Sequence, residues 1–490
     1  MNKTKRDISQ TSPWDKQEFI PLLLGGDINT YSMARAFYEQ YQVKSYIIGK
    51  YPTGPSCNSR IIEYHADPGI DSDEQFLSII NTFARAYAHK KILLIGCGDN
   101  YVARISRYYH NKNHGQSFTN AMQSQSYQKV MQIQDCYTEA SSQPSAALPA
   151  QSQIPQNSIP ARSQKSPPAP ILPSEHSLAP NILTPTTDYE LMQHLQNKET
   201  FYQLCRDHNL PYPRTLVYRP TMKTDFKLPF PFPVILKPSD GISYWEHPFA
   251  GQNKVYQIEN RHELETVIWK IYHAGYQGTL IIQDRIPGND EYMRVLTSYS
   301  DRRGKVKMMC LGHVLLEEHT PHGKGNHAVI LTEQNEALLK QAKAFLESIH
   351  YTGFANFDIK FDQRDQTYRF FEINTRQGRS NYYVTASGLN MAKYPAEEYI
   401  YQRELEFEQP QKEHLWLVVP KAVAFRYIKD PANLAKMRSL FRQNQSVNPI
   451  FQKGDLKPKR FLAMAKNYFS HFIKFRKYYQ CEHTDRRDSN

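Results

Sequence analysis

The chain has 490 residues and a formal net charge of +12, and its 40% of hydrophobic residues is enough for the cores of roughly two to four domains. Its six cysteines lack the spacing of a zinc site or a redox pair, no segment resembles a signal peptide, and no apolar run approaches the ~20 residues that span a bilayer. These features argue against secreted, integral-membrane and fibrous proteins and predict a soluble, cytoplasmic one.

Residues 1–112 show the pattern of a parallel α/β domain. Two short apolar runs, 19–24 and 91–95, each stop at a loop rich in glycine and aspartate, and a helical repeat follows the first. In parallel sheets, ligands bind beyond the carboxyl ends of the strands. The loops Gly25–Asp27 and Gly96–Asp99 lack the full dinucleotide-binding motif. We therefore favour ordinary strand-end turns over direct ligand contacts.

Residues 113–185 differ in composition from the rest of the chain. Between 116 and 185 there are 11 Gln, 12 Ser and 10 Pro, with few large apolar side chains. Such a segment cannot bury enough surface to offset the entropy of ordering, so we expect a disordered insertion. A tolerated surface insertion is the favoured interpretation, and a docking segment for a partner is the alternative.

Strands and helices with antiparallel character are expected again in residues 186–405. Two runs with period-two alternation, 353–361 and 368–376, flank a short turn and predict a β-hairpin. The hairpin sets two pairs of polar residues directly opposite each other: Asp358 with Glu372, and Asn356 with Asn374.

The carboxylates of Asp358 and Glu372 suggest a metal site. Like charges directly across a strand pair are destabilising, and a divalent cation between them would remove that cost. Oxygen ligands favour a hard ion, Mg²⁺ or Mn²⁺. A solvated polar face neutralised by Lys360 or Arg376 explains the same pattern, and both interpretations stay open on spacing alone.

Basic side chains near this hairpin are candidates for binding anions. Arg376 and Arg379 follow the second strand, and the planar guanidinium suits phosphate or carboxylate. Lys237 ends a buried strand before the small polar loop 239–243, where a lysine either reaches a phosphate or extends to water. A chance surface pair is the alternative for the arginines, and the neighbouring metal site favours the anion.

A further strand, 279–284, runs into the segment Ile286–Asp290. The acid at the end of this strand and the backbone after it can hold a purine and a ribose. The Pro-Gly pair in that segment by itself indicates only a turn.

In this order the motifs resemble those of the ATP-grasp ligases and, among them, of the D-aspartate ligases of Gram-positive cell-wall synthesis. The similarity extends over nearly the whole chain except the first dozen residues and the insertion. It rests on the following segments: Phe19–Asn29, Lys198, Val234–Lys237, Ile282–Gly288, Met308–His313, Tyr351–Asp358 and Glu372-Ile-Asn-Thr-Arg376-Gln-Gly-Arg379. The resemblance implies an ATP-grasp fold, with an N-terminal α/β domain at 1–112 and a two-lobed ATP-binding region at 186–405.

The resemblance also implies roles for individual residues. The nucleotide would be bound by the following residues: Lys198 and Lys237 at the phosphates, the lid Ser239–Ser243 above them, Gln283, Asp284 and Ile286 at the adenine, and Asp290 near the ribose. Asp358, Glu372 and Asn374 would hold two Mg²⁺ ions. Arg376, helped by Arg294 and Arg379, would stabilise the transferring phosphoryl group or the substrate carboxylate. The loop His319–Asn326 would border the acceptor site.

The reaction that the resemblance implies uses ATP to activate the β-carboxylate of D-aspartate as an acyl phosphate. The lysine side-chain amine of the peptidoglycan precursor pentapeptide then displaces phosphate. Another ATP-grasp carboxylate–amine ligase making a different peptide-like bond is the first alternative. The stereochemistry of the acid, the general base and the oligomeric state are left open.

Residues 406–490 form a basic, aromatic C-terminal extension. Between Lys453 and Gln480 there are eight basic residues and one acid. We favour a helix that packs its aromatic face on the core, with its lysines in water, over one that lies on an anionic membrane surface. A polyanion- or membrane-binding protein without the ligase activity is the remaining alternative. It leaves the facing carboxylates unexplained, so we expect no nucleic-acid partner.

Overall fold

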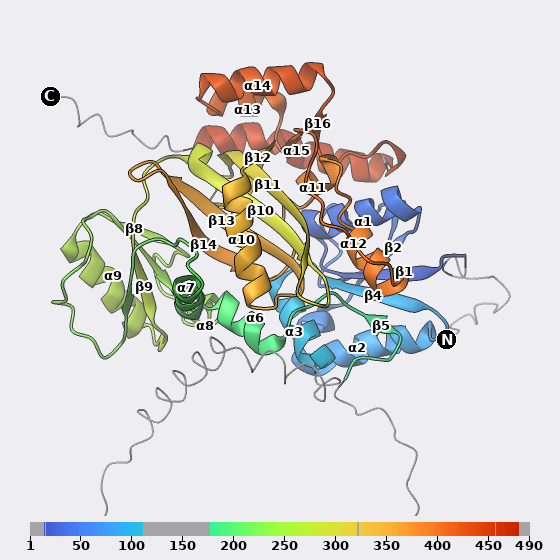
Figure 1. Ribbon diagram of the computed structural model, residues 1–490, viewed down its shortest axis with the longest axis horizontal. Coiled ribbons are helices and arrows are strands. Elements are labelled where there is room, and N and C mark those ends of the chain that lie inside the picture. Colours follow the sequence, from blue (N-terminus) through green and yellow to red (C-terminus); the bar gives the residue numbers. More distant parts are fainter. Residues whose placement is uncertain (1–13, 15, 111–176, 321–322, 456, 480–490) are drawn as a thin grey trace, which may run out of the picture.

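The computed structural model describes residues 14, 16–110, 177–320, 323–455 and 457–479 (Figure 1). Most of the predicted insertion, residues 113–176, therefore lies outside the described residues. Residues 177–185, which the composition assigned to that insertion, instead join the N-terminal domain, because Leu178 and Ile182 are buried in its core.

The N-terminal domain is built on a parallel five-stranded sheet, as the sequence predicts. In spatial order its strands are β3 (Ile62–Ala66), β2 (Ser45–Gly49), β1 (Phe19–Leu24), β4 (Lys91–Gly96) and β5 (Ile182–Leu183). Its helices are α1 (Ile28–Tyr41), η1 (Pro68–Asp71), α2 (Asp73–Ala86) and α3 (Asp99–His110). Successive residues of β1 point to opposite faces, so Phe19 and Leu23 share a core with α1, and Ile20 and Leu22 share one with α2.

A seven-stranded, mainly antiparallel sheet forms the centre of the molecule (Figure 1). In spatial order its strands are β14 (Thr367–Asn374), β13 (Gly353–Asp362), β10 (Met293–Ser300), β11 (Val306–Glu317), β12 (His327–Glu333), β15 (Leu415–Leu417) and β16 (Ser446–Val447). Helices α6 (Tyr189–Gln196), α7 (Lys198–Asp207) and α10 (Glu336–Ser348) bury their apolar faces in one core with this sheet. The short elements around it are η2 (Asp290–Tyr292), α11 (Tyr382–Ala386), α12 (Lys393–Pro395) and η3 (Ala396–Ile400).

A smaller antiparallel sheet forms a separate lobe beside β14 (Figure 1). Its strands, in spatial order, are β6 (Thr215–Tyr218), β9 (Leu280–Asp284), β7 (Val234–Pro238) and β8 (Tyr256–Ile258). This lobe also contains α8 (Gly241–Trp245) and α9 (Arg261–His273), and it has its own hydrophobic core.

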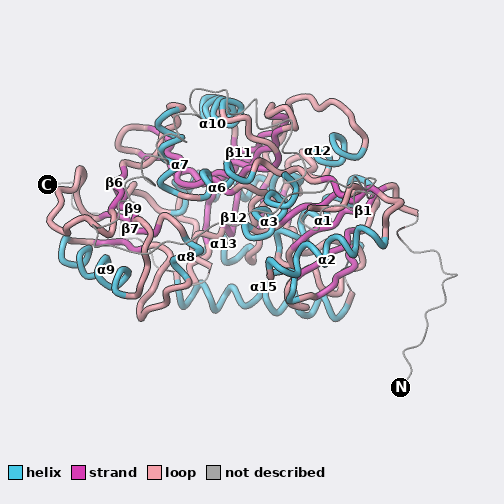
Figure 2. Tube along the Cα trace, turned by 90° about the horizontal axis from the view of Figure 1, so that it is seen from below, coloured by secondary structure: helices cyan, strands magenta, loops and turns pink. Residues whose placement is uncertain are grey.

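The C-terminal residues are not a detached extension. Strands β15 and β16 complete the central sheet, and α13 (Lys421–Tyr427), α14 (Pro431–Arg442) and η4 (Lys453–Asp455) follow from them. The last helix, α15 (Pro458–Tyr478), runs along one edge of the molecule (Figure 2). No helix in the described ranges combines the length and the apolar character needed to cross a bilayer.

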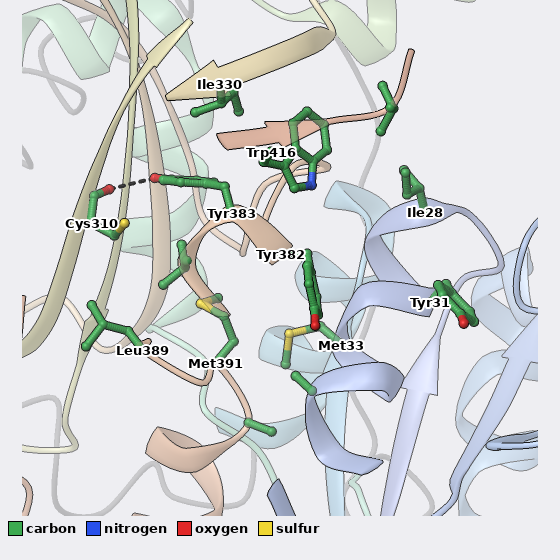
Figure 3. Packing of buried hydrophobic residues seen from close by; sticks show 14 of the residues in the cluster. Ile28, Tyr31, Met33, Cys310, Ile330, Tyr382, Tyr383, Leu389, Met391 and Trp416 are labelled. Carbon is green, nitrogen blue, oxygen red and sulfur yellow. Dashed lines mark hydrogen bonds between the residues drawn. The ribbon is translucent and has the colours of Figure 1, made fainter. Parts of the chain in front are cut away.

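One core joins the N-terminal domain to the central sheet (Figure 3). Met33 of α1 and Tyr382 of α11 lie in this core, and the Tyr383 hydroxyl donates to the carbonyl of Cys310 on β11 at 2.6 Å. Because the two units share buried side chains, the loops at the carboxyl ends of β1 and β4 are held against the loop that follows β14.

Candidate functional site

The β13–β14 hairpin has the predicted register. Asp358 is paired with Glu372, and Asn356 with Asn374. A bulge at Phe371 follows this pair, since Ile359 is paired with Phe370. The Asn374 amide lies 3.4 Å from a carboxylate oxygen of Asp358, so three oxygen-bearing side chains meet on one face of the hairpin.

The two carboxylates of this pair have opposite electrostatic surroundings. Burial, followed by the charge of Glu372, raises the pKa of Asp358 to about 7. Burial also acts to raise the pKa of Glu372, but Lys198, Lys254 and Lys237 outweigh it and bring that pKa down to about 2. The site is therefore a carboxylate pair with unbalanced negative charge at Asp358, beside a group of lysines.

The lysines come from two different parts of the structure, namely α7, which packs on the central sheet, and the small lobe. Lys198, at the start of α7, places its Nζ 3.9 Å from a carboxylate oxygen of Glu372. Lys237, on β7, is buried and donates to the Tyr202 hydroxyl at 3.0 Å. Burial, followed by the charge of Lys198, lowers the pKa of Lys237 to about 7. A group with negative charge that entered here would restore Lys237 to its ordinary charged state.

The predicted lid, Ser239–Ser243, is bonded at its start to the backbone of Lys198. The carbonyl of Ser239 accepts from the backbone N–H of Lys198 at 3.3 Å, and its buried hydroxyl accepts from Thr279 at 2.9 Å. Helix α8 starts at Gly241, so the segment expected to be a loop is partly helical. Asp240 accepts from the N–H of Ser243 and caps this turn.

The predicted hinge residues at the end of β9 are engaged with protein groups. The Gln283 amide donates to the Thr215 hydroxyl at 2.9 Å. Asp284 accepts two hydrogen bonds from Arg364, each of 3.1 Å. A cavity of about 230 Å³ adjoins the hinge and is lined by Asp284, Ile286 and Arg214 together with side chains of the β13–β14 hairpin. The side chain of Asp284 is thus paired with an arginine, and its backbone N–H donates to the carbonyl of Arg214 at 2.9 Å.

Arg376 connects the hairpin to the N-terminal domain. Its guanidinium contacts the carboxylate of Asp99, with Nε and Nη2 lying 2.8 and 2.9 Å from the two oxygens. The next residue, Gln377, donates to the carbonyl of Gly96 at 3.2 Å and accepts from Asn29 at 3.2 Å. The loops after β1 and β4 therefore border the site through Arg376 and Gln377.

The other two predicted arginines lie apart from Arg376. Arg379 pairs with Glu318 at 3.1 Å, next to the loop expected at the acceptor side. Arg294 is paired in β10 with Ile359, so it points to the opposite face of the sheet from Asp358, and it binds Glu333. The structure does not bring Arg294 to the carboxylate pair.

Asp290 is held by the end of β11 and by the loop that follows it. Its carboxylate accepts from the N–H of Glu317 at 2.8 Å and lies 3.0 Å from His319 Nε2. Glu317 is itself surrounded by acids: burial, then Asp290, then Asp358 raise its pKa to about 8.

Three residues near the site were not among those predicted from the sequence. Lys254 is an exposed lysine in the turn before β8, and its charge acts on both Asp358 and Glu372. Glu317 ends β11, and Asp99 starts α3. Of these three residues, only Asp99 stood in a segment that the sequence had singled out, the glycine-rich loop at the end of a strand.

The donor set fits a metal ion that also binds a phosphate. In the part of the chain that the structure describes, no three His, Cys, Asp or Glu side chains form a cluster able to hold a metal. Asp358 and Glu372 supply two carboxylates, and Asn374 supplies an amide oxygen. Mg²⁺ characteristically uses one or two carboxylates together with phosphate oxygens of the substrate. The fit therefore depends on a polyphosphate lying between the hairpin and the lysines.

Comparison with known proteins gives one close sequence relative. No family model matches the chain. A D-aspartate ligase from Enterococcus faecium (strain Aus0004) is 34% identical over 477 residues, which is 95% of this chain and 98% of that protein.

Two solved structures share the fold at low sequence identity. The ADP complex of PurK, an N5-carboxyaminoimidazole ribonucleotide synthetase, matches 87% of this chain and 85% of its own, with 10% identity and a TM-score of 0.50. The biotin carboxylase domain of 2-oxoglutarate carboxylase from Hydrogenobacter thermophilus, in complex with MgADP, ADP and bicarbonate, matches 82% of this chain and 74% of its own, with 12% identity and a TM-score of 0.50. The expected ATP-grasp fold is confirmed.

Proposed function

We propose that this chain joins D-aspartate to a peptidoglycan precursor. The chain belongs to the D-aspartate ligase family and is an ATP-dependent ligase that forms carbon–nitrogen bonds. The bond would link the β-carboxylate of D-aspartate to the lysine side-chain amine of the precursor pentapeptide. The 34% identity to a D-aspartate ligase over 95% of the chain supports these substrates. The observation that carries the chemistry is the facing pair Asp358 and Glu372 beside two lysines.

The proposed nucleotide site lies between the hairpin and the small lobe. Lys198 and Lys237 would bind the ATP phosphates, and Ser239–Ser243 would cover them. The backbone of Asp284 and Ile286 would face the adenine, with Gln283 behind it and Asp290 on the ribose side. Lys254 joins this set because its charge already acts on both carboxylates.

Asp358, Glu372 and Asn374 would hold two Mg²⁺ or Mn²⁺ ions. When bound there, the ions offset negative charge on the phosphate oxygens. The raised pKa of Asp358 agrees with this role, because a cation would remove the repulsion from Glu372. Dependence on ATP agrees with a reaction in the cytoplasm.

Arg376 would stabilise the acid as it reacts. A carboxylate is a poor electrophile, so its oxygen first attacks the γ-phosphorus and ADP leaves. Two anions must approach each other in this step, and a guanidinium next to them lowers the cost. Asp99 fixes the guanidinium plane of Arg376, and Arg379 lies toward the acceptor loop.

Water must be kept from the acyl phosphate, which hydrolyses readily. The segment Ser239–Ser243, with α8, would exclude it, and the hydrogen bond from the backbone N–H of Lys198 to the carbonyl of Ser239 supports this role. The acceptor amine, once deprotonated, attacks the acyl carbon, and phosphate leaves with the electrons of the broken C–O bond. The products are an amide, ADP and phosphate.

The proposed substrates are tested by ATP-dependent phosphate release from purified protein with Mg²⁺ and a lysine-containing precursor. D-aspartate is compared with L-aspartate, D-alanine and no acid. We expect release that requires both D-aspartate and the precursor. Release with a different acid would keep the ligase and overturn the substrate. Release with D-aspartate alone, without an amide product, would overturn the acceptor.

A further inference from the structure

The positive charge of the protein is concentrated in its C-terminal residues. Residues 421–480 contain 14 of the 60 basic and 2 of the 48 acidic residues, so their net charge of +12 equals that of the whole chain. The remaining 430 residues are neutral overall. Eleven of these 14 basic residues belong to α13, α14 and α15, which lie together at one end of the molecule (Figure 1).

Helix α15 exposes a row of large apolar side chains on its outer face. Of the ten large apolar side chains that are exposed among the described residues, five belong to this helix. They are Phe461 at 45% exposed, Leu462 at 68%, Phe469 at 60%, Phe472 at 44% and Ile473 at 72%. At about 100° per residue they fall within a sector of about 120°. We call these five residues the outer stripe.

The opposite face of α15 is fixed to the protein at both ends. Arg460 is fully buried, pairs with Asp455 at 3.5 Å, and lies 4.4 Å over the ring of Tyr31. Phe475 is buried against the rings of Tyr427 and Tyr479. The predicted packing of aromatic residues on the core is therefore correct for this face only. Because the helix is held in place, the outer stripe cannot turn inward.

Cations border the outer stripe, and no acid interrupts it. Lys459, Lys466 and Lys477 are exposed along one margin of the stripe, and the exposed Arg476 lies within it. From Pro458 to Tyr478 the sequence contains six Lys and Arg and no Asp or Glu. An apolar sector with a cationic margin is the pattern of a helix that lies in the interface of an anionic bilayer.

A second copy of this chain fits the outer stripe less well. A two-fold contact through α15 would place each stripe on the other and bring two sets of lysines together. Like charges at the rim of an interface oppose its formation. An anionic lipid bilayer has apolar acyl chains for the outer stripe and negative headgroups for the lysines at its margin.

We propose that the outer stripe of α15 docks this protein on an anionic lipid surface. The helix lies in the plane of the interface, with the five apolar side chains among the acyl chains and the lysines at the headgroups. This inference is independent of the proposed substrates, because none of the residues of the stripe belongs to the nucleotide site.

The test is co-sedimentation of the full chain with vesicles. Vesicles of equal parts phosphatidylglycerol and phosphatidylcholine are compared with vesicles of phosphatidylcholine alone, at low and high salt. We expect at least tenfold stronger binding to the anionic vesicles, and weaker binding as salt is raised. Equal binding to both vesicle types, or no binding, would overturn the proposal.

Two variants and a control separate the stripe from nonspecific adhesion. L462S/I473S and K466Q/K477Q should each reduce binding to the anionic vesicles at least tenfold, with unchanged melting temperature and ATP-dependent ligation in solution. W269S removes an apolar side chain that is 61% exposed on α9 and should bind like the wild type. Full binding by L462S/I473S would overturn the proposal. A dimer in sedimentation velocity that this variant abolishes would also overturn it, because the stripe would then belong to a second copy.

Discussion

Asp358 shows how the candidate site differs from ordinary surface charge. Two carboxylates face each other across a strand pair, and only Glu372 receives enough positive charge from the lysines to stay ionised easily. The folded protein without ligands therefore carries an unfavourable charge at Asp358. Such a cost is characteristic of a functional site, where a ligand removes it.

We expect D358N to be more stable than the wild type in EDTA at pH 8. The pKa of Asp358 in the folded state, about 7, lies above the ordinary value of 3.8, so folding favours its protonated form. The contribution of the protonated Asp358 to the stability of the folded protein is therefore fully present below pH 3.8 and is lost as the pH rises through 7. The difference in unfolding free energy between variant and wild type should grow over this range and reach ~4 kcal/mol. Urea unfolding at pH 4 and pH 8 measures it.

Asp362 supplies the control for this experiment on the same strand. Arg364 lowers the pKa of Asp362, so D362N should be less stable than the wild type at pH 8.

Addition of Mg²⁺ and ATP should then stabilise the wild type more than D358N. A D358N variant that is less stable than the wild type in EDTA at pH 8 would refute the repulsion.

Glu372 and Lys237 are the residues whose loss should abolish turnover. E372Q keeps the shape of the side chain and removes the charge opposite Asp358, and K237M removes a buried cation at the proposed phosphates. Each should lower kcat/KM at least ~100-fold while the circular dichroism spectrum stays unchanged. E336Q, at an exposed ion pair of α10, is the matched control. Undiminished activity in E372Q or K237M would contradict the site.

At the scale of elements, the loop after β14 is placed by a close approach that only glycine allows. A Cβ on Gly378 would lie 2.8 Å from the side chain of Asn356, which donates to Thr297 in the core of the sheet at 2.9 Å. The flanking residues Arg376 and Arg379 depend on the course of this loop.

G378A should therefore lower activity more than stability. The added methyl group displaces the loop, and a shift of less than 1 Å at a guanidinium is enough to cost ~10-fold in kcat/KM. G454A is the control, because nothing lies within 4 Å of a Cβ at that position. Steady-state kinetics and melting temperature are measured together. Wild-type kinetics in G378A would show that the approach does not position the arginines.

The anchor of α15 is an element-scale contact of a different kind. Asp455 has no exposed side-chain surface and accepts from Tyr31 at 2.9 Å and from Ser59 at 2.7 Å as well as pairing with Arg460. R460M leaves this carboxylate buried without its cation and should destabilise the protein by about 3 kcal/mol. In D455N/R460M the charge is gone, and part of that loss should be recovered. Urea unfolding compares these with K459M, at an exposed neighbour that should change little.

At the scale of the whole molecule, the N-terminal domain is a part of the site. Its loops reach Arg376 and Gln377, and its helix α1 shares a core with α11 and the central sheet. A protease site placed between residues 140 and 141 should therefore leave two fragments that co-elute in gel filtration and retain activity after cleavage. Separation of the fragments without denaturant would contradict the shared core.

The hairpin was predictable from the sequence because period-two alternation and a short turn leave one register that buries the apolar faces. The position of Arg294 was not, because its face depends on how β10 is aligned with β13, which no local pattern records. The contact of Arg376 with Asp99 joins residues 277 positions apart, so it follows only from the packed domains. For α15 the composition showed an amphipathic helix, but not that apolar residues cover two of its faces.

Strand β5 has a consequence for the synthesis of this protein. It pairs with β4 but starts at Ile182, whereas β4 ends at Gly96. At about 5–20 residues per second, a ribosome needs several seconds to add the intervening chain. During that time the outer edge of β4 has unpaired backbone groups, which can pair with another nascent chain. The length of the insertion thus sets how long each newly made chain is exposed to aggregation or needs a chaperone.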